Sequence, residues 1–131
     1  MASFKKQIAR YLTTRHPDSL VRLPRGIFTV RILPDEVLNE LIEASLASAQ
    51  RYGLTWQSSI NAFVTLRFTV APNFDTQPSI AAALAPDDRP PDFRMRDLPE
   101  AILPQDWEEA VSAYDPGAWI AAGARNAEPI R

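Results

Sequence analysis

The sequence of 131 residues contains no cysteine and only one histidine, His16. These absences exclude disulfide bonds, thiolate metal ligands, a cysteine nucleophile and a multi-histidine metal site. No apolar run approaches the roughly 18 residues that a membrane-spanning helix requires. The sequence also has no glycine-rich phosphate loop and no dinucleotide-binding fingerprint. We therefore expect a soluble, cytoplasmic binding protein that has no cofactor and no metal ion.

Glycine is scarce, with four residues, whereas proline is abundant, with twelve. Few glycines allow few tight β-turns, and many prolines suit short helices with defined starts and stops. Hydrophobic residues make up 46% and charged residues 23% of the chain, which are ordinary values for a globular protein. The length favours one domain. We predict a mainly α fold, with a single helical domain over residues 1–117 and a C-terminal tail over 118–131.

The net charge of −2 is unevenly distributed along the chain. Residues 1–33 carry seven Lys or Arg against Asp18 alone, whereas the remaining residues carry seven Arg against fifteen acids. A basic N-terminal segment could follow a phosphate backbone, but the sequence pI of 5.4 and the lack of a known motif disfavour nucleic acid as a partner. The alternatives are that this segment lies against acids of 35–43 or 106–109, or binds an acidic partner protein.

The strongest structural signal is a helical hairpin over residues 34–71, which we expect to form the centre of a small bundle. Asp35 and Glu36 suit the positive end of a helix dipole, and Gly53 suits its left-handed C-terminal cap. Thr55 is expected to cap a second helix that ends before Pro72. A strand over 62–71 is the competing interpretation. The apolar positions with helical spacing are Leu38, Leu41, Ile42, Ala49, Tyr52, Ile60, Phe63, Val64 and Phe68.

Residues 2–15 predict an amphipathic helix that His16-Pro17 ends. A transit peptide or a membrane-surface helix are the alternatives to a helix that docks on the core. Residues 19–33 alternate in part between apolar and polar side chains around Pro24-Arg25-Gly26. One short β-hairpin near residues 19–33 is therefore an option beside an irregular extended segment.

The second half of the chain predicts short helices separated by prolines. Asp75 or Thr76 is expected to cap one of them, and two more are expected near 97–103 and over 104–114. The intervening loop contains Asp87, Asp88, Asp92 and Asp97, interleaved with Arg89, Arg94 and Arg96. Because this spacing matches no calcium loop, we expect mutual ion pairs rather than a cation site.

No residue pattern selects a catalytic, cofactor-binding or metal-ligating side chain, although an uncharacterised enzyme with a carboxylate site stays an alternative. The candidate protein-binding residues are Trp107, Tyr114 and Trp119, because large aromatic side chains are frequent interface anchors. We expect them to line or cover an apolar groove against the 34–71 hairpin. The alternative is that they complete the core.

Several short motifs along residues 3–110 resemble one family of bacterial proteins. They are His16-Pro17, Tyr52-Gly53-Leu54-Thr55, Ile60, Phe63-Val64, Leu66, Phe68, Pro72, Phe74-Asp75 and Arg94-Met95. The pattern is similar to that of small helical accessory proteins encoded beside type VI secretion effectors. The sequence departs from the family by an apolar insertion around 24–33 and by Ala71, where glycine often precedes the proline.

The resemblance implies a co-chaperone or adaptor that helps to load an effector toxin onto the secretion spike. Its expected partner is the effector toxin or the adaptor chaperone of that toxin, and no catalytic residue is implied. An immunity protein that neutralises a cognate toxin is the alternative. An immunity protein often presents a strongly charged surface, whereas an adaptor presents apolar or aromatic area.

Overall fold

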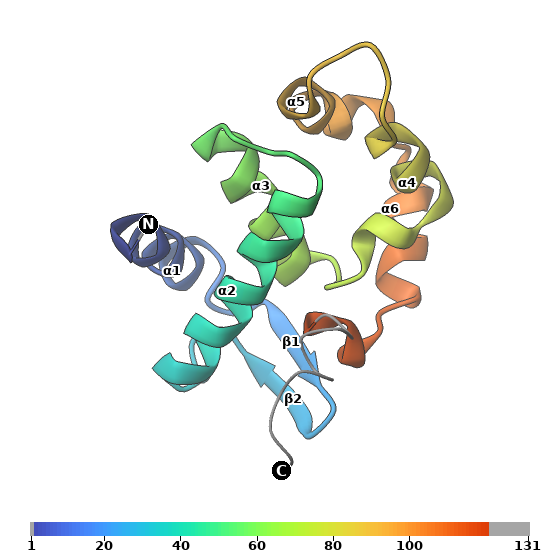
Figure 1. The fold of residues 1–131 in the computed structure, drawn as a ribbon. Helices are drawn as coiled ribbons and strands as arrows, with labels where there is room; N and C mark the ends of the chain where they lie inside the picture. The colour runs from blue at the N-terminus through green and yellow to red at the C-terminus, as the bar shows by residue number, and fades with distance from the viewer. Residues whose placement is uncertain (1, 121–131) are drawn as a thin grey trace, which may run out of the picture.

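The computed structural model describes residues 2–120, which form a mainly helical structure with one short β-hairpin (Figure 1). The helices are α1 (Ala2–Arg15), α2 (Asp35–Arg51), α3 (Gln57–Thr69), α4 (Pro78–Leu84), α5 (Pro91–Ala101) and α6 (Pro104–Ser112). The two strands of the hairpin are β1 (Leu20–Leu23) and β2 (Gly26–Thr29). Two short 3-10 helices, η1 (Phe74–Thr76) and η2 (Pro116–Trp119), lie between and after the helices of the second half. This confirms the predicted fold class, including the β-hairpin. Within the described residues, none of the helices combines the length and apolar character needed to cross a bilayer.

The predicted helical hairpin is confirmed, since α2 and α3 pack side by side at the centre of the molecule (Figure 1). Gly53 ends α2 with a positive φ of +80°, which explains the glycine at this position. A Cβ atom there would also lie 3.2 Å from Cγ of Pro91. α1 lies on one side of this pair, and α4, α5 and α6 lie on the other (Figure 1).

The predicted Thr55 cap of α3 is wrong, because a carboxylate from α5 accepts the hydrogen bonds at the start of this helix. The N–H groups of Thr55 and Trp56 donate to Oδ1 of Asp92 at 3.0 and 2.9 Å, and the Thr55 hydroxyl donates to Oδ2 at 2.8 Å. Burial acts to raise the pKa of Asp92, but the hydrogen bonds from Trp56, Thr55 and Ser59 outweigh it and hold this pKa below its ordinary value. One acidic side chain therefore ties the first turn of α3 to the first turn of α5.

The core consists of two clusters of buried side chains on either side of the α2–α3 pair. The first joins α1, the hairpin, α2 and the end of α3, and it includes Trp119. The second joins α3 to η1, α4, α5 and α6. Its aromatic centre is Phe63, whose ring centroid lies 5.1 Å from that of Phe74 and 5.4 Å from that of Tyr52. Ile60 packs against both clusters, so α3 connects them.

Two further boundaries differ from the sequence predictions. α4 is capped by Gln77, whose Oε1 accepts from the Ile80 N–H at 2.9 Å, rather than by Asp75 or Thr76. α5 begins at Pro91, well before the predicted start near residue 97, and continues through Pro99. Pro99 lies in the last turn of α5, where its missing N–H removes one internal hydrogen bond from the helix.

The predicted ion pairs in the aspartate loop are confirmed for two of its acids. Asp87 pairs with Arg89 and Arg94, and Asp97 pairs with Arg89 and Arg96. Asp92 instead caps α3. The basic N-terminal segment contacts the acids of 35–43 through Lys5 and Glu43, which lie 2.7 Å apart; within the described residues it forms no ion pair with 106–109.

Truncation of the buried residues Leu41 and Phe63 tests the hairpin core. We expect Leu41→Ala and Phe63→Ala each to lower the free energy of unfolding by about 2–5 kcal/mol, because each leaves a cavity. Urea titration measures this. Leu103→Ala is the matched control, because Leu103 is 56% exposed. A loss below about 0.5 kcal/mol for either core variant would contradict this packing.

Asp92→Asn tests the shared cap through its pH dependence. At pH 7 we expect the variant to lose about 1–2 kcal/mol of unfolding free energy, because the amide caps α3 without a charge. Since the Asp92 pKa is lowered in the folded state, its contribution is present above the ordinary aspartate pKa of about 3.9 and fades as the pH falls below it. Urea titrations at pH 7 and pH 3 measure both values, with the exposed Asp88→Asn as control. An equal difference at the two pH values would argue against the assignment.

Candidate protein-binding groove at the hairpin end

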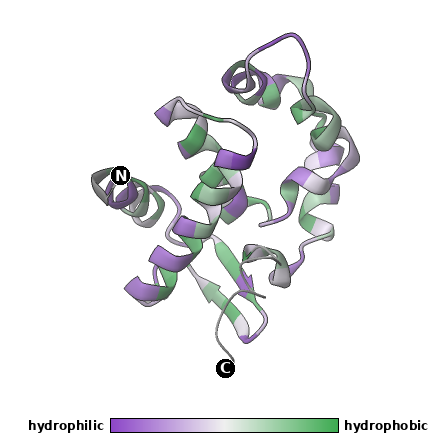
Figure 2. Cartoon of the chain, viewed as in Figure 1, coloured by the Kyte–Doolittle hydropathy of each residue, from purple (hydrophilic) through white to green (hydrophobic). Residues whose placement is uncertain are grey.

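The β-hairpin has one buried face and one exposed face. Its register pairs Val21 with Phe28 and Arg22 with Ile27, and Val21 is fully buried. On the other face Leu20 is 52% and Ile27 is 65% exposed, and Ile32, just after β2, is 66% exposed. We call Leu20, Ile27 and Ile32 the hairpin patch. Both strands are largely green in the hydropathy colouring (Figure 2), so the exposed face of the hairpin includes apolar side chains.

The outer edge of β1 is closed by two aromatic side chains from the end of the described chain. The Arg22 N–H donates to the Tyr114 hydroxyl at 2.9 Å, and the Trp119 indole N–H donates to the Arg22 carbonyl at 3.1 Å. The Arg22 guanidinium also lies 5.2 Å from the centre of the Tyr114 ring. These side chains therefore occupy the positions that a neighbouring strand would take.

Arg67 on α3 holds Trp119 in this position from within the core. This arginine is 3% exposed, and its guanidinium donates to the Ser45 hydroxyl at 2.9 Å, the Ser48 hydroxyl at 3.1 Å and the Trp119 carbonyl at 2.6 Å. It also lies 5.3 Å from the centre of the Trp119 ring. Among residues 2–120 it has no ion-pair partner, so neutral oxygens and an aromatic ring solvate the buried charge.

Burial perturbs the titration of the polar groups around Trp119. It lowers the pKa of Arg67 to about 10, although the negative charge of Asp75 opposes this shift. Burial raises the pKa of Tyr114, and the hydrogen bond from the Arg22 backbone opposes it. At neutral pH the Arg67 guanidinium is therefore charged and the Tyr114 phenol is neutral.

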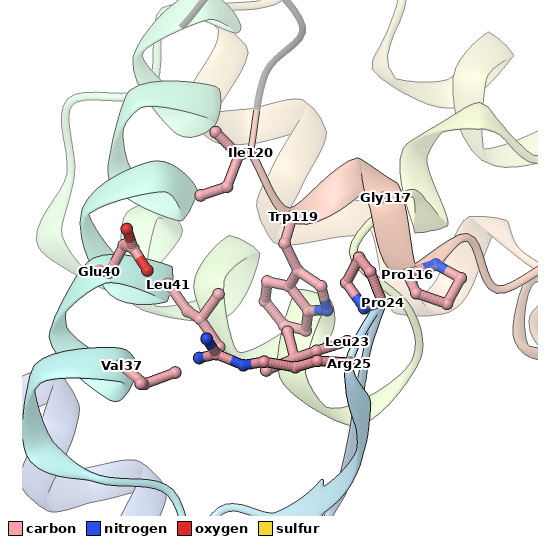
Figure 3. A pocket seen from close by; sticks show the side chains of 10 residues that line it. All are labelled: Leu23, Pro24, Arg25, Val37, Glu40, Leu41, Pro116, Gly117, Trp119 and Ile120. Atoms are coloured by element: carbon pink, nitrogen blue, oxygen red, sulfur yellow. The ribbon is translucent and has the colours of Figure 1, made fainter. Parts of the chain in front are cut away.

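A groove opens between the hairpin, α2 and η2. It consists of two adjoining cavities of about 460 and 510 Å³ that share Leu23, Arg25, Val37 and Glu40. The first lies on the β1 side and reaches Leu41, Trp119 and Ile120, and the second lies on the β2 side and reaches Phe28 and Leu33. Figure 3 shows the Trp119 indole among the side chains that line the first cavity, with the Arg25 side chain extended toward α2. We call these two cavities together the hairpin groove.

The structure separates the three aromatic residues that the sequence singled out. Trp119 is 2% exposed and lines the groove against α2. Tyr114 is half-buried beside β1, and Trp107 on α6 packs against the second core cluster; neither lines the groove. Their role in binding a partner stays a prediction. Because Trp119 belongs to the first core cluster, the packed structure extends past the predicted boundary at residue 117; residues 121–131 of the predicted tail lie outside the described residues.

Sequence reasoning missed most of the groove. Leu23, Arg25, Val37 and Glu40 come from two elements whose contact requires the hairpin to fold onto α2. The available signal was the position of Val37 and Leu41 one turn apart at the start of α2. Arg67 gave no signal, because an arginine in a helical pattern ordinarily faces solvent.

The described residues contain no group of three or more His, Asp or Glu side chains that could hold a metal ion. Comparison with known proteins adds no assignment, because no family model, no curated protein and no solved structure matches the chain.

Substitution of Arg67 tests whether its branched guanidinium supports the groove. Arg67→Lys keeps a positive charge but cannot reach three oxygens in three directions, and Arg67→Met keeps similar bulk without charge. We expect each to lower the free energy of unfolding by about 1–3 kcal/mol, because buried oxygens lose their donors. Urea titration followed by circular dichroism measures both, with the exposed Arg10→Lys as control. A lysine variant as stable as the wild type would rule out the branched contact as the support.

Proposed function

We propose that the chain is a protein-binding accessory factor, a co-chaperone or adaptor, and that the hairpin groove receives an apolar segment of its partner. The observation that carries the proposal is the groove itself, because its walls include Leu23, Val37, Leu41 and Trp119 while Arg25 and Glu40 provide charged groups. Apolar lining with a few polar groups is typical of a recognition site. In line with the sequence resemblance, the proposed partner is a type VI secretion effector or its adaptor chaperone.

The hairpin patch favours this role over toxin neutralisation. Leu20, Ile27 and Ile32 are each more than half exposed, and all three lie in or next to the hairpin that forms one wall of the groove. Apolar area of this kind suits a partner segment that is itself hydrophobic. A toxin inhibitor would instead need a concentrated charge to oppose an active site. The charges around the groove have both signs, since Arg25 lies opposite Glu36 and Glu40.

Co-expression with a type VI secretion effector and with its adaptor chaperone tests the proposal. We expect one of the two proteins to co-elute with the full chain. Val37→Gln should reduce the co-eluting partner about tenfold, because it places an amide in the apolar part of the groove. Leu103→Gln is the matched control, since it makes the same kind of change just before α6, outside the hairpin groove.

Four outcomes are decisive for this proposal. If neither protein co-elutes with the wild type, the adaptor role is wrong. If Leu103→Gln loses the partner while Val37→Gln keeps it, binding occurs at a different surface. If the chain alone allows cells to survive the toxin, the protein is an immunity protein; loss of effector delivery on its deletion, without self-killing, supports the adaptor.

A further inference from the structure

The two edges of the hairpin differ in how their backbone groups are satisfied. On β1 the N–H and C=O of Arg22 point outward and are bonded by Tyr114 and Trp119. Arg22 and Ile27 are therefore a non-hydrogen-bonded pair, and the N–H and C=O of Ile27 point away from β1. Ser19 and Val30, three positions further along the hairpin, confirm this alternation, because the Val30 N–H donates to the Ser19 carbonyl at 3.1 Å.

The outward groups of β2 are open over a short length. Among the described residues, the Ile27 backbone has no partner outside the hairpin. The Thr29 carbonyl accepts from the N–H groups of Ile32 and Leu33 at 3.1 and 3.2 Å, which marks the end of the open edge. An open edge beside exposed apolar side chains is a template for another strand.

We infer that a partner protein binds by adding an extended strand to the open edge of β2; this rests on the proposed function and specifies how the partner is recognised. Side chains of a strand alternate between its two faces. One set on the added strand would enter the β2-side cavity beside Phe28, Leu33 and Val37, and the other would contact Ile27 and Ile32. Backbone hydrogen bonds give such a complex its affinity, and the cavity gives it specificity.

The charges at the edge indicate what the added strand contains. Arg25, immediately before β2, is exposed and has no ion pair among the described residues, whereas Arg31 beyond β2 pairs with Asp18 at 2.8 Å. The added strand should therefore have apolar residues at every second position, and it should carry an acidic residue at the end that lies beside Arg25. A second copy of this chain fits less well, because it would bring Arg25 and Arg31 of both copies to one seam.

Proline substitution separates strand addition from simple apolar contact. Ile27→Pro removes the outward N–H without removing a hydrogen bond between β1 and β2, as is tolerated on edge strands. Ile27→Thr is the matched control, because it removes apolar area but keeps the N–H and the branched Cβ. Arg25→Glu tests the charge independently, and circular dichroism with urea titration establishes that all three variants fold.

The probe is a synthetic peptide of alternating valine and threonine that begins with two aspartates, titrated into the full chain and followed by amide NMR shifts. We expect shifts at Gly26–Thr29, about tenfold weaker binding to Ile27→Pro and to Arg25→Glu, and near-normal binding to Ile27→Thr. A peptide with lysines in place of the aspartates should bind more weakly to the wild type.

Equal binding to Ile27→Pro, or shifts confined to other surfaces, would overturn strand addition. A wild-type dimer that Ile27→Pro dissociates in sedimentation would instead identify a second copy as the occupant and would also overturn the inference. Each of these results leaves the proposed function standing if the partner still co-elutes with the full chain. Absence of any co-eluting partner would count against the proposed function itself.

Discussion

The buried guanidinium of Arg67 is the contact on which the hairpin end of the molecule depends. It joins three parts of the chain, because it starts on α3, bonds to Ser45 and Ser48 on α2, and holds the backbone of Trp119. A charged side chain is costly to bury, and three hydrogen bonds together with an aromatic ring offset that cost. Once Trp119 is fixed in this way, its indole can bond to β1. The position of the hairpin therefore follows from a residue on the central helix.

The hairpin itself is too small to be stable alone, since two strands of four residues have little to bury. Val21 and Phe28 pack in the first core cluster, which includes side chains of α1, α2 and α3, and the aromatic contacts on Arg22 close one edge. The second edge and the hairpin patch are left exposed beside the groove. Because the edge of β1 is covered and the edge of β2 is open, this end of the molecule has its proposed capacity to bind a strand.

Local sequence patterns predicted the elements better than they predicted the contacts between them. The α2–α3 hairpin follows from helical spacing and from Gly53, and the β-hairpin follows from Pro24-Arg25-Gly26. Caps were harder to predict, because a side chain distant in the sequence can replace the local one: the Asp92 carboxylate takes the place expected for the Thr55 hydroxyl, 37 residues away. The groove was missed for the same reason, since the wall formed by Val37 and Arg25 exists only after the hairpin docks. Of the three predicted binding residues, only Trp119 lines the groove.

Amide hydrogen exchange of the full chain, measured with and without its co-purified effector or adaptor, tests the central claim most directly. The account predicts that the partner slows exchange most at Gly26–Thr29 and around Val37 and Leu41, where the open strand edge and the hairpin groove lie. Protection that instead concentrates on α4, α5 and α6, with the hairpin unchanged, would contradict it.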